Sequence, residues 1–159
     1  MRKLNKAFVL IVGLLLPIAG LCQSMGYMDA DSVEEAAGMI YSTTLSSRIM
    51  RENCGAKFPD LVERFDADLT AWQKAEASII AKSDRIMRKA RDLNPKEFEV
   101  NITALEGMFT KALTAMSEMP GEAGARVYRQ ACTNHFSALA TGAWRERTPK
   151  AYKFLDEMP

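Results

Sequence analysis

The sequence predicts an all-α protein: a bundle of four main helices plus a short C-terminal helix, after an N-terminal signal peptide. Apolar residues recur at alternating steps of four and three over most of the chain, which is the spacing of one helix face. Proline, glycine and asparagine divide this pattern into helix-length segments, and no strand-like alternation or internal repeat competes with it. We therefore expect a signal peptide at 1–24 and a single helical-bundle domain at 25–159, long enough to bury its own core.

The N-terminal segment has the layout of a secretory signal peptide. A basic start precedes an apolar run over 7–21, and small residues lie around the expected cleavage positions near Cys22 and Ser24. The run is short for an uncleaved anchor, which needs ~20 residues to cross a bilayer. Acylation of Cys22, as in a bacterial lipoprotein, is the other alternative, although Leu21 is not the small residue that such signals place there. The expected location is periplasmic or secreted, in a bacterium.

The charge of the mature chain bears on its partners. Residues 1–24 hold three basic and no acidic residues, so their removal changes the formal net charge from +1 to −2. Such a balanced charge creates no overall field for nucleic acid or for anionic lipid. We expect no membrane span in the mature form, and another protein of the cell envelope as the partner.

Two cysteines remain once Cys22 is removed with the signal peptide, namely Cys54 and Cys132. In an oxidising compartment, an isolated pair in a small domain is most often a disulfide. Neither cysteine belongs to a Cys-x-x-Cys motif or to a zinc-binding spacing. We therefore predict a disulfide between them, which stabilises the fold by ~4–5 kcal/mol through the long loop that it closes.

The first helix is expected over 33–53. Ser32 and Glu35 form a capping-box pattern at its start, but the apolar positions then drift and Gly38 weakens the helix. Cys54-Gly55 is expected to end it, with Gly55 in a left-handed turn.

A long second helix is predicted over 58–93, with Pro59 at its first position. Its apolar seam lapses only at Glu76 and Ser83, and a seam of this length needs partner helices. The next helix is opened by 94–97, where proline follows a capping asparagine, and is ended by 120–121. A fourth helix over about 122–141 and a short last one over 149–157 complete the bundle.

The predicted helix lengths conflict with the predicted disulfide. A straight helix over 58–93 is about 50 Å long, whereas the helix after it returns only about 35–40 Å. Cys132 on the fourth helix would then lie far from Cys54, although the Cα atoms of a disulfide lie roughly 4.4–6.8 Å apart. We therefore expect the long helix to break around 81–84, or the fourth helix to cross the bundle.

Few residues suggest chemistry. His135, the only histidine, is a candidate metal or haem ligand or general base, but a single histidine without clustered carboxylates or thiolates cannot complete a zinc or di-iron site. A buried histidine with a hydrogen-bond partner is the simpler interpretation. Glu76 interrupts an apolar seam and must be paired with Arg or Lys, at a bundle end, or functional.

Methionines and aromatic residues give weaker signals. The pairs Met25/Met28 and Met116/Met119 have a spacing that could offer thioethers to copper(I), although the second pair lies on a core seam, where methionine is ordinary packing. Three aromatic residues on one face of the long helix could line a cleft but have the spacing of core residues: Phe58, Phe65 and Trp72. No phosphate-binding loop or nucleophile motif is present, so we expect neither an enzyme nor a cofactor.

The run Cys54-x3-Phe58-Pro59-x5-Phe65-x6-Trp72 resembles a pattern of small, secreted, helical proteobacterial proteins of uncharacterised function. The similarity covers about 50–90. It implies export, a helical fold and a structural role for Cys54, but no activity.

In architecture alone, the chain is also similar to periplasmic four-helix b-type cytochromes, which hold haem between a methionine on the first helix and a histidine on the last. Met39 or Met50 with His135 would be the corresponding residues. The function we expect from the sequence is an exported, non-enzymatic binding or interaction protein, such as an adaptor, inhibitor or immunity-type protein. A haem- or metal-binding bundle is the alternative.

Overall fold

The computed structural model describes residues 29–159, so the predicted signal peptide and the cleavage positions near Cys22 and Ser24 lie outside the described residues. The described part is helical and contains no strand. Its elements, in order, are α2 (Val33–Lys57), the 3₁₀ turn η2 (Pro59–Leu61), α3 (Val62–Ala75), α4 (Ala77–Leu93), α5 (Pro95–Ser117), α6 (Gly121–Ala140), α7 (Ala143–Arg147) and α8 (Pro149–Asp156). The predicted all-α bundle is confirmed, but the long second helix is two helices and α7 was not predicted.

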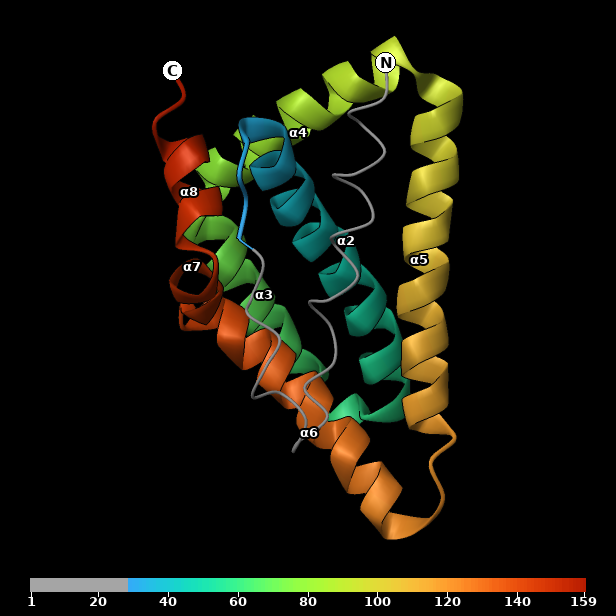
Figure 1. The fold of residues 1–159 in the computed structure, drawn as a ribbon. Helices are drawn as coiled ribbons and strands as arrows, with labels where there is room; N and C mark the ends of the chain where they lie inside the picture. The colour runs from blue at the N-terminus through green and yellow to red at the C-terminus, as the bar shows by residue number, and fades with distance from the viewer. Residues whose placement is uncertain (1–28) are drawn as a thin grey trace.

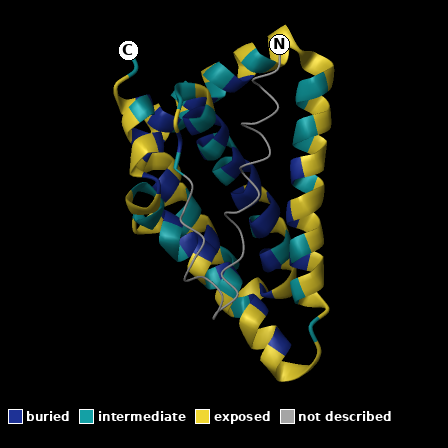
Figure 2. Ribbon diagram, viewed as in Figure 1, coloured by how far each residue is buried: buried dark blue, intermediate teal, exposed yellow. Residues whose placement is uncertain are grey.

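Helix α2 is the centre of the bundle (Figure 1), in contact with α3, α4, α5, α6 and α8. Figure 2 shows how much of it is buried. A helix surrounded on several sides has no single apolar seam, which explains its drifting pattern. Small residues such as Ala36, Ala37 and Gly38 are buried there and let neighbouring helices approach closely.

Polar side chains are tolerated inside this central helix because its own backbone satisfies them. Thr43 and Thr44 donate to the carbonyl oxygens of Met39 and Ile40, one turn earlier. Ser47 is fully buried, and its hydroxyl donates to the Thr43 carbonyl oxygen at 2.7 Å. Such local bonds remove the cost of burying a hydroxyl group.

The two ends of α2 differ in how well the sequence predicted them. At its start, Ser32 Oγ accepts from the Glu35 N–H at 3.1 Å, as the capping box predicts. At its end, the prediction was wrong: the helix continues past Cys54-Gly55 to Lys57, and Gly55 is helical. A Cβ at Gly55 would lie 2.6 Å from Arg51 Nη1, the end of a flexible side chain, and 3.3 Å from Val62 Cγ2, so the position is crowded but is not a left-handed turn.

The long helix breaks at Glu76, and not around 81–84 as the sequence suggested. Glu76 has φ −105° and ψ 19°, and α4 leaves the line of α3 there (Figure 1). The other lapse in the seam, Ser83, lies inside α4, where its hydroxyl donates to the Ala37 carbonyl oxygen at 2.7 Å. Ser83 is therefore a helix–helix contact and not a break.

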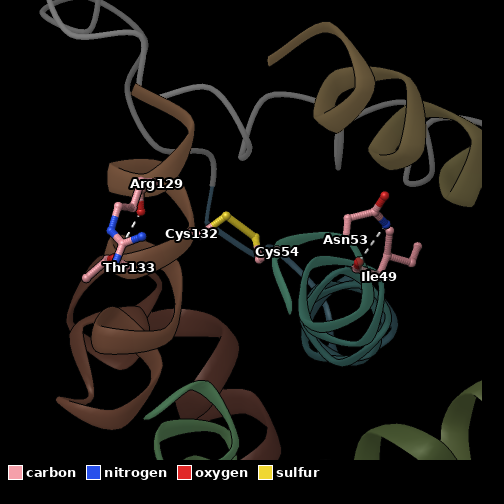
Figure 3. The surroundings of a disulfide bond; sticks show 6 residues. All are labelled: Ile49, Asn53, Cys54, Arg129, Cys132 and Thr133. Atoms are coloured by element: carbon pink, nitrogen blue, oxygen red, sulfur yellow. Dashed lines mark hydrogen bonds between the residues drawn. A yellow bond between two sulfur atoms is a disulfide. The ribbon is translucent and has the colours of Figure 1, made fainter. Parts of the chain in front are cut away.

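The predicted disulfide is present, with Cys54 and Cys132 Cα atoms 5.9 Å apart. Figure 3 shows it joining α2 to α6, with Asn53 and Thr133 hydrogen-bonded within their own helices beside it. Both expected solutions to the length conflict occur, since the long helix breaks and α6 runs obliquely across the bundle (Figure 1). Shortening the return path in this way brings Cys132 to the end of α2.

The buried side chains form two clusters. The first, which we call the disulfide core, consists of Leu45, Ile49, Met50, Cys54, Phe58, Phe65, Trp72, Leu105, Phe109, Leu113, Tyr128, Cys132, Phe136 and Leu139. The second, which we call the alanine core, consists of Ala30, Ala36, Ala37, Ile40, Ile79, Met87, Ala151, Tyr152 and Leu155. Helix α2 contributes its C-terminal half to the first and its N-terminal half to the second.

Helix α8 is fixed against the alanine core at both ends. Asp29 accepts from the N–H groups of Lys150 and Ala151 at 2.7 and 2.9 Å, which satisfies two free donors of the first turn. Lys82 Nζ donates to the carbonyl oxygens of Leu155 and Met158 at 2.9 and 2.7 Å. A carboxylate at the N-terminus and an ammonium at the C-terminus both complement the helix dipole.

Candidate functional site

Polar groups from distant parts of the chain meet where α3 and α4 separate. We call them the Glu76 cluster: Glu76, Arg145, Tyr152 and Asp156. Glu76 is 8 % exposed, and Arg145 holds its carboxylate with two hydrogen bonds, Nε to Oε1 at 3.2 Å and Nη2 to Oε2 at 2.7 Å. Arg145 also reaches Asp156 at 2.8 Å, and its guanidinium lies over the Tyr152 ring, 4.4 Å from the centroid.

The electrostatics of this cluster suit a structural ion pair. Hydrogen bonding to Glu76, with a further contribution from Asp156, raises the pKa of Arg145 above its ordinary value. The guanidinium therefore stays charged and cannot act as a proton donor. Burial raises the pKa of the Tyr152 phenol, and the nearby Trp72 indole N–H offsets part of that rise. Each carboxylate oxygen of Glu76 accepts one hydrogen bond from Arg145.

Two buried indole N–H groups, unlike the side chains of the Glu76 cluster, lack a hydrogen-bond partner in the described part of the chain. Trp72 Nε1 and Trp144 Nε1 are buried without an acceptor in hydrogen-bonding geometry. Trp72 lowers the pKa of Tyr152, but its Nε1 forms no hydrogen bond with a described residue. Both indoles belong to, or pack against, the disulfide core, where ring packing fixes their orientation.

His135 lies inside the bundle, as its position on the core face predicted. Its Nε2 is 3.0 Å from Ser47 Oγ. Since the single Ser47 proton is donated to the Thr43 carbonyl oxygen, Ser47 must accept from His135, which places the histidine proton on Nε2. Burial lowers the pKa of His135 to about 4, so the ring is neutral at physiological pH. The rings of Phe136 and Trp144 meet it edge-on, at 5.2 and 6.3 Å between centroids.

The methionines proposed as partners of His135 lie in different places. Met50 is part of the disulfide core, whereas Met39 packs against the alanine core. For His135 to bind a metal through Nε2, it would have to give up its bond to Ser47. Met116 packs against the disulfide core, and the pair Met25/Met28 lies outside the described residues.

The three aromatic residues considered as cleft-lining groups are core residues. Phe65 stacks on Phe136 with centroids 4.5 Å apart, and Phe58 meets Tyr128 edge-on at 5.4 Å. Trp72 is 2 % exposed. Within residues 29–159, no group of three or more His, Cys, Asp or Glu side chains is arranged to hold a metal ion. Over the same range, no helix combines the length and apolarity needed to cross a membrane.

Sequence reasoning singled out Glu76 and His135 but missed the residues that satisfy them. Arg145 lies 69 positions from Glu76, and Ser47 lies 88 positions from His135. No local pattern joins either pair, because contact between them depends on how the helices are placed. The one available signal was the demand of a buried carboxylate for a cation.

No family model matches this chain, and no curated protein or solved structure matches it either.

Proposed function

We propose that this chain is an exported helical-bundle protein that binds another protein of the cell envelope and catalyses no reaction. One observation carries the proposal. Glu76 and His135 are the two side chains that the sequence singled out as candidates for chemistry, and each is hydrogen-bonded to another side chain of the bundle. Because these buried polar groups are hydrogen-bonded within the protein, a structural role suits them, and we place partner binding on the protein surface.

The expected export of the chain is supported by the Cys54–Cys132 bond, because disulfides persist in oxidising compartments and are rare in the cytosol. Intact-mass measurement of protein recovered from the cell envelope, with and without reductant, tests this part. We expect a chain that begins near Cys22 or Ser24 and gains two hydrogens on reduction. A full-length chain in which Cys54 and Cys132 are both free thiols would contradict it.

The binding part is tested by crosslinking in the cell envelope, followed by purification through a C-terminal tag. We expect one partner in stoichiometric amount, also recovered when Glu76→Gln and His135→Gln replace the wild type, since neither residue serves binding. Purified protein that recovers no partner and turns over a substrate would overturn the proposal. A Soret band that disappears in His135→Ala would replace it with haem binding.

A further inference from the structure

The corner at which α4 meets α5 combines exposed basic side chains with exposed apolar side chains. We propose that this corner, residues 85–96, docks on an anionic lipid surface, with Leu93 entering the interfacial layer. The inference goes beyond the proposed function, because it concerns binding to lipid and requires no protein partner.

The charge of the corner differs from that of the chain as a whole. Residues 85–96 hold five basic residues and one acidic residue, a formal charge of +4, whereas the described chain, residues 29–159, carries −2. The rest of the described chain therefore carries −6. An anionic partner is attracted mainly by the charges nearest to it, because salt screens charges that lie more than about 10 Å away. The overall balance thus conceals a local positive field.

Four of the five basic side chains of the corner have no partner among the described residues. Arg85, Arg88 and Lys89 are exposed, share one face of α4, and form no hydrogen bond or ion pair with a described residue. Lys96, at the start of α5, is in the same state. Six arginines elsewhere each have a carboxylate partner: Arg48, Arg51, Arg64, Arg126, Arg129 and Arg145.

The acidic residues in and beside the corner are Asp84, Asp92, Glu97 and Glu99. Asp92 lies 3.7 Å from Arg91, and Glu97 accepts from the Asn94 side chain. Glu97 keeps its charge, because its partner is a neutral amide, but no carboxylate of a described residue lies within ion-pair distance of Arg85, Arg88 or Lys89.

An exposed leucine stands at the apex of this charged surface. Leu93 ends α4 and is 78 % exposed, and Val100 in the second turn of α5 is 68 % exposed. These are the two most exposed large apolar side chains in the described part of the chain. The corner projects from the upper end of the bundle (Figure 1), and its residues from 91 to 96 are exposed (Figure 2). A projecting apolar tip among cations fits a planar, deformable layer of acidic headgroups better than it fits the rigid surface of a protein.

The test is cosedimentation of the exported, purified protein with two kinds of vesicle at low salt: phosphatidylcholine alone, and phosphatidylcholine with an equal amount of phosphatidylglycerol. We expect binding to the second kind only, with release by added salt. The triple variant Arg85→Gln/Arg88→Gln/Lys89→Gln should bind roughly a hundredfold more weakly, since each basic residue near an anionic surface contributes about a fivefold factor. Leu93→Ser should weaken binding roughly tenfold.

A matched control separates the corner from net charge. Lys57, Lys74 and Lys111 are exposed, and no described residue is an ion-pair partner of any of them. Their replacement by glutamine removes the same charge from other surfaces and should leave vesicle binding unchanged. All variants share one N-terminus, so any contribution from the first residues is constant.

Three outcomes would overturn the proposal. Wild-type protein could stay in solution with the anionic vesicles. Both triple variants could lose binding equally, which would reduce the effect to net charge. The protein could also ignore vesicles yet bind a polyglutamate resin in a manner that depends on Arg85, Arg88 and Lys89, which would assign the corner to an acidic protein instead.

Discussion

The two halves of α2 lie in cores that are held together by different means. Around its C-terminal half, the disulfide core combines a covalent link to α6 with aromatic contacts such as the Phe65–Phe136 stack. Around its N-terminal half, the alanine core combines close helix approach with polar contacts at helix ends, supplied by Asp29 and Lys82.

The break at Glu76 lies between these two cores. Helix α3 packs mainly on α6, whereas α4 packs on α2, α5 and α8. One continuous helix could not serve both arrangements, and Arg145 satisfies the carboxylate at the break. The comparison teaches that a single helix can be stabilised covalently at one end and by reversible polar contacts at the other. Each prediction below separates these two modes.

The largest effect is expected from the disulfide. Cys54→Ala/Cys132→Ala removes a link between residues 78 positions apart, which lowers the free energy of unfolding by about 4–5 kcal/mol in the chain-entropy account. Urea unfolding measures the change. Hydrogen exchange should rise first in α3 and α6 and less in α8. Reductant should reproduce the effect in the wild type and have none in the variant; equal stability of reduced and oxidised wild type would contradict the prediction.

The next effect depends on pH and arises at His135, whose ring contacts Phe136 of the disulfide core. The pKa of His135 is lowered to about 4 by burial, against about 6.5 in the unfolded chain. The unfolded chain therefore binds the proton more readily, so this stability is complete above about pH 6.5 and is lost as the pH falls toward 4. The loss is about 2–3 kcal/mol by pH ~4.5.

Urea unfolding at neutral pH and near pH ~4.5 checks this value. His135→Gln keeps a donor for Ser47 but cannot titrate, so its stability should change far less between the two conditions. A wild type that is equally stable at both pH values would show that His135 is not buried as a neutral ring.

Most of the helix boundaries could be predicted from the sequence because local chemistry sets them. The Ser32–Glu35 cap, Pro95 and Pro149 each start a helix where their backbone preferences require it. Asn94 is a partial exception: it stands at the start of α5, but its side chain bonds Glu97 and not a backbone N–H. The disulfide followed from cysteine number and compartment.

The arrangement of the helices could not be predicted in the same way. The central place of α2 was hidden because burial on several sides removes the periodicity that marks a helix face. The break was misplaced because Glu76 and Ser83 look alike in the pattern, and only a distant arginine distinguishes them. Within the candidate site, the buried carboxylate could be predicted from the sequence but its arginine partner could not.

A smaller effect is expected at the boundary between the cores. Glu76→Gln leaves Arg145 without its buried partner and should cost about 1–2 kcal/mol, less than a fully buried pair because the Arg145 side chain is 42 % exposed. Asp156→Asn is the control: it removes the other partner of Arg145, which is 51 % exposed, and should cost about 0.5 kcal/mol or less. Equal losses in the two variants would mean that burial at the break is unimportant.

The smallest effect is expected where the alanine core depends on one carboxylate. Thr148 stands at the start of α8, but its hydroxyl donates to the Trp144 carbonyl oxygen, so the first free N–H groups of α8 rely on Asp29. Asp29→Ala should therefore cost about 1 kcal/mol, the usual value of a helix cap.

Hydrogen exchange at the Lys150 and Ala151 amides gives the decisive measurement. Both should exchange faster in Asp29→Ala, while amides near Cys54 and Cys132 stay protected, because the covalent link holds that core independently of α8. Asp31→Ala is the control, since the Asp31 carboxylate pairs with the Lys150 side chain at 3.1 Å, bonds no α8 backbone N–H and is 80 % exposed. If Asp29→Ala instead loosened both cores equally, the two halves of α2 would unfold as one unit, and their different construction would have no consequence for stability.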